Sequence, residues 1–268
     1  MIKHKKSFHS HTYLCRHAEG IPLDYLKEAF KQGYQALGIS EHAPMPYLKS
    51  ANSVRMDMSE FPLYLSLLEE GESFAKKHNI AFYKGLEIEY FTEVDIYESY
   101  LRDLDYLILG QHYIIENNKF KSTFRLERYE QVELYRNLVM DALKTGYFNM
   151  LCHPEICFNN ILNPSKEMYE LLRPVIKLAK ELNIPIELNA NGIRKAFKEY
   201  NSLDERYYRY PRIEFLKMVK EEGAPVIIGS DTHKVNYLHD WAVEKAYQIA
   251  HRLELNIVYD LKMNYYFK

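Results

Sequence analysis

Seven histidines and two carboxylates stand at or just beyond the ends of strand-like runs in this 268-residue chain. They are His9, His11, His17, His42, Glu87, His112, His153, Asp231 and His233. Imidazole and carboxylate groups are the usual protein ligands of zinc, iron and manganese. In a β/α barrel the carboxyl ends of all strands open onto one rim, so side chains this far apart in sequence would meet there. The pattern predicts a site that holds several metal ions.

Two short motifs carry the strongest local signal. His9 and His11 are separated by one residue, and Asp231 and His233 repeat that spacing with a carboxylate and an imidazole. On a strand, residues i and i+2 point to the same face, so each pair can bind one ion. A single His-x-His is common in ordinary strands. The repetition of ligand types at several strand ends is what favours a metal site.

Three further glutamates lie next to ligand positions, on neighbouring faces of the same strand ends. They are Glu41, Glu89 and Glu155. A carboxylate in such a place can hold a metal-binding imidazole in position from behind. A salt bridge without a role in metal binding is an equally good interpretation, and we expect the supporting role for one of the three.

The elements that would position these residues alternate between strand and helix. The spacing of apolar residues predicts strands at 5–10, 35–40, 80–87, 106–111, 147–152, 185–189 and 225–230. Helices are predicted at 23–32, 59–78, 94–101, 126–144, 166–182, 211–222 and 238–253, with a strand-like tail at 257–266. Residues 43–55 form a long polar loop, which we expect at the active site. About seven β-α units without a linker predict one closed or nearly closed α/β barrel over residues 1–268. A dinucleotide-binding fold would need a Gly-rich first turn, and histidines stand there instead.

Composition narrows the class of protein. The net charge of −2 and a pI near 6.6 give no electrostatic case for binding nucleic acid or an anionic membrane. Three cysteines form no disulfide framework, which indicates a reducing compartment. A structural zinc site at Cys152, His153 and Cys157 is the alternative, although no Cys-x-x-Cys pair supports it. Without a membrane-spanning run or a signal peptide, we expect a cytoplasmic protein.

Along its whole length the chain resembles the PHP (polymerase and histidinol phosphatase) family, whose fold is a distorted (β/α)7 TIM-like barrel with three metal ions. The resemblance assigns ligands to each ion. His9, His11, Glu87 and Asp231 would hold the first, Glu87, His112 and His153 the second, and His17, His42 and His233 the third. Glu87 would bridge two ions, and two dications close together make a shared water acidic. The ligand set suits zinc, iron and manganese alike.

Looser motifs are similar to those of the monofunctional histidinol-phosphate phosphatases. They are Glu41-His42-Ala43-Pro44 with Arg55-Met56, the run from Ile186 to Lys195, and Tyr210-Pro211. This resemblance implies a small phosphomonoester as partner, namely L-histidinol phosphate, cleaved to L-histidinol and inorganic phosphate. A PHP-type nucleotide phosphatase or nuclease is the alternative, and a non-catalytic metal-binding protein is a third possibility.

The catalytic roles follow from this chemistry. Glu87 is expected to fix the spacing of two ions, and Asp231 or His233 to relay a proton to the leaving alkoxide. The phosphate is expected to contact His17 and His42. A guanidinium can bond two phosphate oxygens at once, and we expect this of Arg194 first, then of Arg16 and Arg55.

Overall fold

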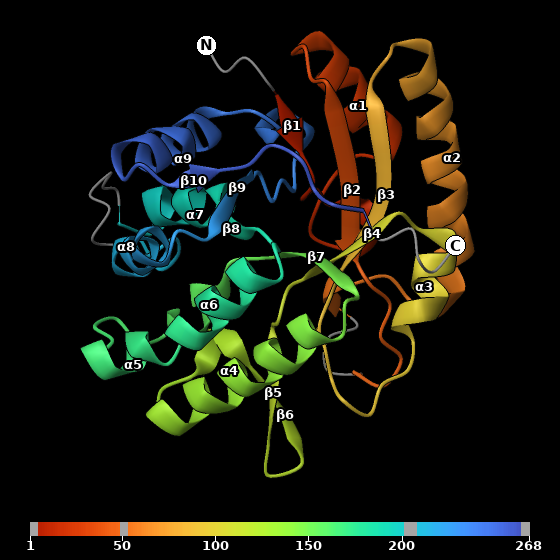
Figure 1. The fold of residues 1–268 in the computed structure, drawn as a ribbon. Coiled ribbons are helices and arrows are strands. Elements are labelled where there is room, and N and C mark those ends of the chain that lie inside the picture. Colours follow the sequence, from red (N-terminus) through yellow and green to blue (C-terminus); the bar gives the residue numbers. More distant parts are fainter. Residues whose placement is uncertain (1–4, 49–52, 201–207, 264–268) are drawn as a thin grey trace.

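The computed structural model describes residues 5–48, 53–200 and 208–263. Its main element is a parallel sheet that curls into a barrel, with helices along its outer side (Figure 1). In spatial order the strands are β1 (Lys6–Ser7), β2 (Ala36–His42), β3 (Ala81–Ile88), β4 (Tyr106–Leu109), β7 (Phe148–Leu151), β8 (Ile186–Asn189), β9 (Pro225–Gly229) and β10 (Asn256–Ile257). All seven strands predicted from the sequence lie in this sheet, and the predicted TIM-like barrel is confirmed.

The barrel closes at its carboxyl rim, just beyond the ends of β1 and β9. Ser10 and Thr232 form an isolated parallel bridge, and the His11 amide donates to the Thr232 carbonyl at 2.9 Å. The first and last strands that carry ligand motifs are therefore neighbours. This contact brings the His9–His11 motif beside the Asp231–His233 motif.

The helices lie along the outer side of the sheet, and local signals mark the ends of several of them. They are α1 (Pro22–Lys31), α2 (Phe61–Lys77), α3 (Tyr97–Asp103), α4 (Tyr129–Lys144), α5 (Lys166–Glu170), α6 (Arg173–Glu181), α7 (Ala190–Tyr200), α8 (Ile213–Glu222) and α9 (Trp241–Arg252). Pro22 begins α1, because its missing N–H and fixed φ suit a first helical turn. Gly223 ends α8 in the left-handed region at φ 69°. None of the helices in the described ranges is long and apolar enough to cross a membrane.

Three local features differ from the sequence prediction. The helix predicted at 166–182 is two helices, α5 and α6, because Pro174 has no N–H to give to the carbonyl of Glu170. A hairpin of β5 (Tyr113–Glu116) and β6 (Lys119–Ser122) follows β4, and α7 directly follows β8; neither was predicted. Of the tail predicted at 257–266, β10 pairs with β9, and residues 264–266 lie outside the described residues.

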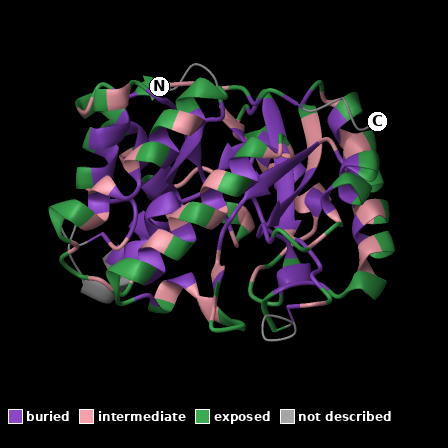
Figure 2. Cartoon of the chain, turned by 60° about the horizontal axis from the view of Figure 1, so that its bottom comes forward, coloured by how far each residue is buried: buried purple, intermediate pink, exposed green. Residues whose placement is uncertain are grey.

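Two apolar layers surround the strands. The larger lies between the sheet and the helices, so the strands and the inner helix faces are buried while the outer faces are exposed (Figure 2). The smaller fills the barrel interior with Phe8, which directly follows β1, and with side chains from β2, β4, β7 and β9. Leu261 and Met263, from the segment after β10, complete this inner layer. The packed interior gives the rim a rigid base.

Candidate metal centre

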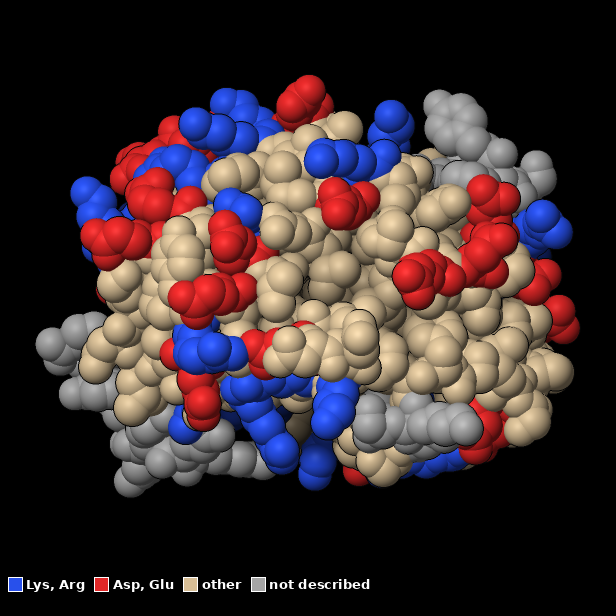
Figure 3. All heavy atoms as spheres, turned by 90° about the horizontal axis from the view of Figure 1, so that it is seen from below, with Lys and Arg blue, Asp and Glu red and all other residues tan. Residues whose placement is uncertain are grey.

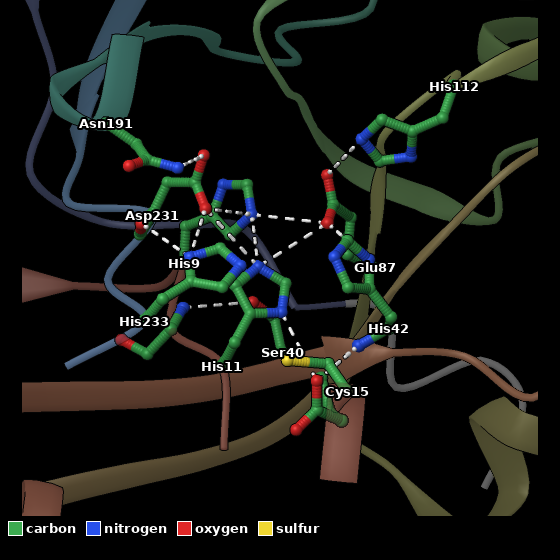
Figure 4. A network of polar contacts seen from close by, with 12 residues as sticks. His9, His11, Cys15, Ser40, His42, Glu87, His112, Asn191, Asp231 and His233 are labelled. Carbon is green, nitrogen blue, oxygen red and sulfur yellow. Dashed lines mark hydrogen bonds and ion pairs between the residues drawn. The ribbon is translucent and has the colours of Figure 1, made fainter. Parts of the chain in front are cut away.

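Four ligand atoms meet at the centre of the rim, where Figure 4 shows their side chains pointing toward one another. The Nε2 atoms of His9 and His11 are 3.1 Å apart, and each lies 3.5 Å from Glu87 Oε2. Asp231 Oδ1 is 3.7 Å from His9 Nε2 and 3.4 Å from His11 Nε2. Ligand atoms of a tetrahedral ion with bonds of about 2.0–2.1 Å are separated by about 3.3–3.4 Å. The four atoms therefore fit one transition-metal ion.

Glu87 also faces a second group of ligands through its other oxygen. Oε1 lies 3.0 Å from His153 Nε2 and 3.5 Å from His112 Nε2. Behind this carboxylate is Gly110, where an added Cβ would come within 2.1 Å of Oε1. A residue with a side chain at that position would displace the carboxylate. The backbone directly after β4 thus leaves the space in which Glu87 can face two groups of ligands.

The third group consists of His17, His42 and His233. The Nε2 atoms of His17 and His233 are 3.0 Å apart, and one ligand atom from each of the three lies within 4.8 Å of the others. Burial and the nearby His11 lower the pKa of His42 to about 3, so its imidazole is neutral and available to a metal. His42 Nδ1 also lies 2.9 Å from Glu87 Oε2, which joins this group to the first.

Glu187, the second residue of β8, supports the first group from behind and was not predicted as a site residue. Its Oε1 lies 2.7 Å from His9 Nδ1, and its Oε2 accepts from the His153 amide at 3.1 Å. A Cβ at Gly229 would lie 1.6 Å from Glu187 Oε1, so only glycine leaves room for this carboxylate. The signal in the sequence was a carboxylate between Ile186 and Leu188, inside the strand predicted at 185–189.

Two of the three glutamates beside the ligands hold an imidazole in position. Glu41 Oε1 lies 3.3 Å from His11 Nδ1, and Glu89 Oε1 lies 3.0 Å from His112 Nδ1. Glu155 instead accepts from the Arg212 amide at 3.1 Å. Carboxylates behind metal-binding histidines fix the tautomer that presents the other nitrogen. One supporting glutamate was expected, and the structure has two.

The electrostatics of the cluster favour added positive charge. Burial alone would lower the pKa of His9, but Glu187 and Asp231 outweigh it and hold that pKa well above its usual value. Burial also opposes the charged form of His11, yet hydrogen bonds to the carboxylates of Asp231 and Glu41 raise the pKa of His11 to about 9. Burial likewise disfavours the ionised form of Glu87, but the surrounding imidazoles keep its pKa well below the usual range. Buried carboxylates that stabilise cations in this way suit metal ions.

Backbone strain accompanies two of the ligands. His153 has φ 28° and Asp231 has φ 45°, both in the left-handed region that most residues avoid. The second oxygen of Asp231 accepts from Asn189 Nδ2 at 3.0 Å and from Asn191 Nδ2 at 3.2 Å. Strained positions persist where the surroundings over-determine them, as these amides do, and they cluster at functional sites.

Each of the three arginines expected to bind phosphate pairs with a carboxylate of the protein. Arg194 is 6% exposed and bonds to both oxygens of Asp240 and to Ser230 and Tyr237. It lies outside the lining of the cavity over the metal ligands, because the turn after β8 directs it toward α9.

The other two arginines also have protein partners. Arg16 pairs with Glu60 on α2's entry turn and is not among the residues that line this cavity. Arg55 does line the cavity, but it is buried and bonds to both oxygens of Glu89. It therefore acts on His112 through that glutamate.

The Cys/His alternative is not supported by the contacts. Cys157 Sγ points to the Pro154 carbonyl at 3.5 Å, while His153 Nε2 faces Glu87. Burial raises the pKa of Cys157 well above its usual value, which disfavours the thiolate that zinc requires. The described cysteines are all free and buried.

A cavity of about 300 Å³ opens above the ligands. Its wall away from the cluster contains Tyr113, Ser122 and Phe124, which belong to the hairpin or directly follow it, together with Lys195 and Tyr210. Lys195 Nζ donates to the Tyr210 hydroxyl at 3.2 Å. None of these five was predicted as a site residue, although Lys195 and Tyr210 belong to the motifs quoted above. The placement of Tyr113, Ser122 and Phe124 depends on a hairpin that local patterns did not reveal. The predicted loop at 43–55 contributes Val54 and Arg55, and its residues 49–52 lie outside the described residues.

Comparison with known families agrees with this geometry. The model of the PHP domain matches residues 7–191, which is well over half of the chain. The chain belongs to the PHP family. The match includes every ligand position except Asp231 and His233, and the barrel closure brings those two to the same site.

Individual relatives share most of the length. A probable histidinol-phosphatase of Deinococcus radiodurans is 28% identical over 239 residues, 84% of this chain and 85% of the relative. Two solved structures have the same fold. A histidinol phosphatase described as putative, from Listeria monocytogenes, superposes with TM-score 0.71 at 19% identity, over 88% of this chain and 98% of the other. The second structure is the histidinol phosphate phosphatase of Lactococcus lactis in complex with zinc, L-histidinol and phosphate. It superposes with TM-score 0.68 at 16% identity, over 97% of this chain and 98% of the other.

Proposed function

We propose that this protein is a metal-dependent phosphomonoesterase that uses three divalent ions of zinc, iron or manganese. The observation that carries the proposal is the position of Glu87. Its two oxygens face two separate sets of imidazoles, and a third set adjoins the first through His42. The nine predicted ligands supply these sets, with further carboxylates behind His9, His11 and His112.

The chain's own residues prepare the site for phosphoryl transfer. Bound divalent ions would neutralise the phosphoryl oxygens and make a water between them acidic. Glu87 fixes the spacing of two of the groups, and Glu187 prevents rotation of His9 by bonding its Nδ1. Asn189 and Asn191 hold the second oxygen of Asp231, which leaves Oδ1 directed at the imidazoles. Groups already in place need little reorganisation in the transition state.

Departure of the alkoxide requires a proton at the edge of this cluster. Asp231 and His233 both line the cavity, and we assign the relay to this pair. His233 Nδ1 lies 3.2 Å from the Asp231 carbonyl oxygen and 3.5 Å from Asp231 Oδ1, so the two side chains stand next to each other at this edge. His17 and His42 line the same cavity and stand where phosphoryl oxygens would approach.

We assign L-histidinol phosphate as the substrate. Relatives that cover most of this chain carry the name histidinol-phosphatase, among them that of Deinococcus radiodurans. The volume of about 300 Å³ suits a small monoester, and the aromatic side chains of Tyr113, Phe124 and Tyr210 offer surfaces for an imidazole ring. A nuclease would need a groove with a stacking platform for a strand, and this cavity is compact. A small monoester is therefore favoured over nucleic acid.

The test is phosphate release by metal-reconstituted protein from a panel of monoesters. The panel contains histidinol phosphate, p-nitrophenyl phosphate, nucleoside monophosphates and short single-stranded DNA. We expect kcat/KM for histidinol phosphate to exceed that for p-nitrophenyl phosphate by at least about a hundredfold, because polar groups of the site stay unpaired with a poor mimic. Comparable kcat/KM values for nucleotides or DNA would reject histidinol phosphate as the substrate but would still support a phosphoesterase activity. No release from any ester would reject both.

A further inference from the structure

A phosphatase that prefers one ester has to recognise the alcohol as well as the phosphate. The residues that line the cavity over the metal ligands include Arg55 and Lys195, and Lys and Arg side chains gather near the lower edge of the face shown in Figure 3. Positive charge attracts any phosphate ester, whatever alcohol it carries. The choice of alcohol therefore depends on the uncharged walls of the cavity and on how firmly they are held.

Two aromatic walls of the cavity stand next to the second group of ligands. The Tyr210 ring meets the His153 imidazole at 64°, with centroids 5.9 Å apart, and the Phe124 ring lies parallel to the His112 imidazole at 6.1 Å. Lys195 Nζ lies 5.9 Å from the centroid of each aromatic ring. The two walls and the metal ligands thus form one continuous surface around the cavity.

The segment that follows β7 connects both walls to the metal centre. It begins at His153, whose Nε2 faces Glu87. Asn159, further along this segment, donates from Nδ2 to the Phe124 carbonyl at 3.2 Å. The Asn159 carbonyl accepts from Arg209 Nη1 at 2.9 Å. Since Arg209 directly precedes Tyr210, one segment carries a metal ligand and contacts the backbone beside both walls.

Arg212 fastens the Tyr210 wall to the same segment. Its guanidinium donates to three carbonyls of that segment at 2.8–3.1 Å, namely those of Phe158, Ile161 and Leu162. Its Nε donates to the Arg209 carbonyl at 2.7 Å, and its amide donates to Glu155 Oε1 at 3.1 Å. Arg212 is only 6% exposed, so these bonds are shielded from water. They fix the backbone before and after Tyr210.

A further contact comes from α7. A Cβ at Gly192 would overlap the Tyr210 carbonyl oxygen, so the first turn of this helix packs directly against the backbone of the wall. The same helix carries Lys195, whose Nζ donates to the Tyr210 hydroxyl at 3.2 Å. Tyr210 is therefore held at its backbone by Arg212 and Gly192, and at its hydroxyl by Lys195.

We propose that Arg212 is a positioning residue for substrate choice, which sets the place of the Tyr210 wall relative to the metal centre. Arg212 is not among the described residues that line the cavity, so it acts through that wall. A flat ring packed against the wall would carry its ester oxygen to a fixed place beside the metal ligands, and such positioning lowers the barrier to reaction. The identity of the alcohol, L-histidinol, rests on the proposed function.

The two products serve as separate probes of the metal-loaded protein. Arg212→Lys keeps the positive charge but replaces the planar fork by a single ammonium, which cannot reach all four carbonyls. In calorimetry we expect the Kd of L-histidinol to rise at least about tenfold, and the Kd of inorganic phosphate to change by less than about twofold. KM for histidinol phosphate should rise, while metal content stays at the wild-type level. Equal weakening of both products, or unchanged histidinol binding, would overturn the proposal.

Amide hydrogen exchange gives a readout that needs no ligand. In Arg212→Lys, residues 208–212 should exchange faster, while the amides of β8 and β9 stay as protected as in wild type. Unchanged exchange at 208–212 would reject the positioning role even in an enzyme active on histidinol phosphate. Faster exchange in a protein inactive on every monoester would keep that role and reject the proposed function alone.

Two further variants separate this effect from a general loss of stability. Gly192→Ala displaces Tyr210 from the side of α7, and it should weaken histidinol binding without weakening phosphate binding. Arg173→Lys makes the matched substitution on α6, where the arginine pairs with three glutamates and does not line the cavity. It should bind both products like wild type. A loss of histidinol binding as large in Arg173→Lys as in Arg212→Lys would contradict the proposal.

Discussion

Among single residues, Glu87 has the most connections within the cluster. Its Oε2 lies within 3.5 Å of His9 and His11, and its Oε1 within 3.5 Å of His112 and His153. We expect Glu87→Ala and Glu87→Gln to lose metal and at least about a hundredfold in kcat, more than the 10–100-fold typical of supporting residues. Elemental analysis and kcat of both variants provide the measurement.

The comparison for this prediction is Glu89→Gln, which alters a carboxylate that touches only His112 among the ligands. It should keep most of its metal and lose less activity than either Glu87 variant. Near-normal turnover by Glu87→Gln would show that the bridging carboxylate is a different one, with Glu89 the first to examine.

Replacing Glu187 should impair metal binding and turnover almost as much as replacing Glu87, although Glu187 is not predicted to contact a metal ion. It is buried, bonds to His9 Nδ1 and leaves Nε2 pointing at the cluster. Glu187→Gln should lower metal affinity or kcat about 10–100-fold, since the amide holds the imidazole less strongly than a carboxylate does. A metal titration of the variant tests this. Glu167→Gln, on the exposed end of α5, is the control and should behave like wild type.

At the level of elements, Arg194 joins α7 to the start of α9. Its guanidinium pairs with Asp240, which also caps α9 by accepting from the amides of Ala242 and Val243. Arg194→Ala leaves that largely buried carboxylate, whose side chain is 10% exposed, without its partner, so we expect the free energy of unfolding to fall by about 3 kcal/mol. Urea unfolding of the metal-loaded protein measures the change.

The matched control is Arg16→Ala, which removes a partly exposed pair with Glu60 and should cost at most about 1 kcal/mol. KM for the monoester should stay near wild type in Arg194→Ala at temperatures where it is folded. A large rise in KM without loss of stability would restore the phosphate-binding role expected from the sequence.

At the level of the whole molecule, the ligands come from strands all around the barrel. In the first group, Glu87 lies in β3, and the other ligands follow β1 and β9. In the second group, His112 follows β4 and His153 follows β7. Ions bound between these segments would cross-link the rim, and a ligand that binds only the folded state stabilises it. We therefore expect EDTA to lower Tm by on the order of 10 °C.

Elemental analysis of protein purified without chelator should show more than one equivalent of transition metal per chain and at most three. Returning zinc, iron or manganese should restore both Tm and activity. A metal content near zero, with Tm and turnover unaffected by EDTA, would contradict the metal centre itself.

The sequence by itself determined the barrel and the ligand types. Alternating apolar runs and helix signals are local patterns, so each strand end could be located without knowledge of its neighbours. A parallel barrel then brings strand ends to one rim by geometry alone. For this reason His9 and Asp231 could be predicted to meet, although 222 positions separate them.

Only the tertiary structure decided what stands behind the ligands and around the cavity. Glu187 supports His9 from 178 positions away, and Gly229 leaves the space for it, a pairing that no local pattern encodes. Arg194 and Lys195 are neighbours in sequence, yet the helical turn after β8 directs one to Asp240 and places the other in the cavity wall. The type of residue at a strand end follows from the chain. Its partner depends on long-range packing, which fixes the direction of each side chain.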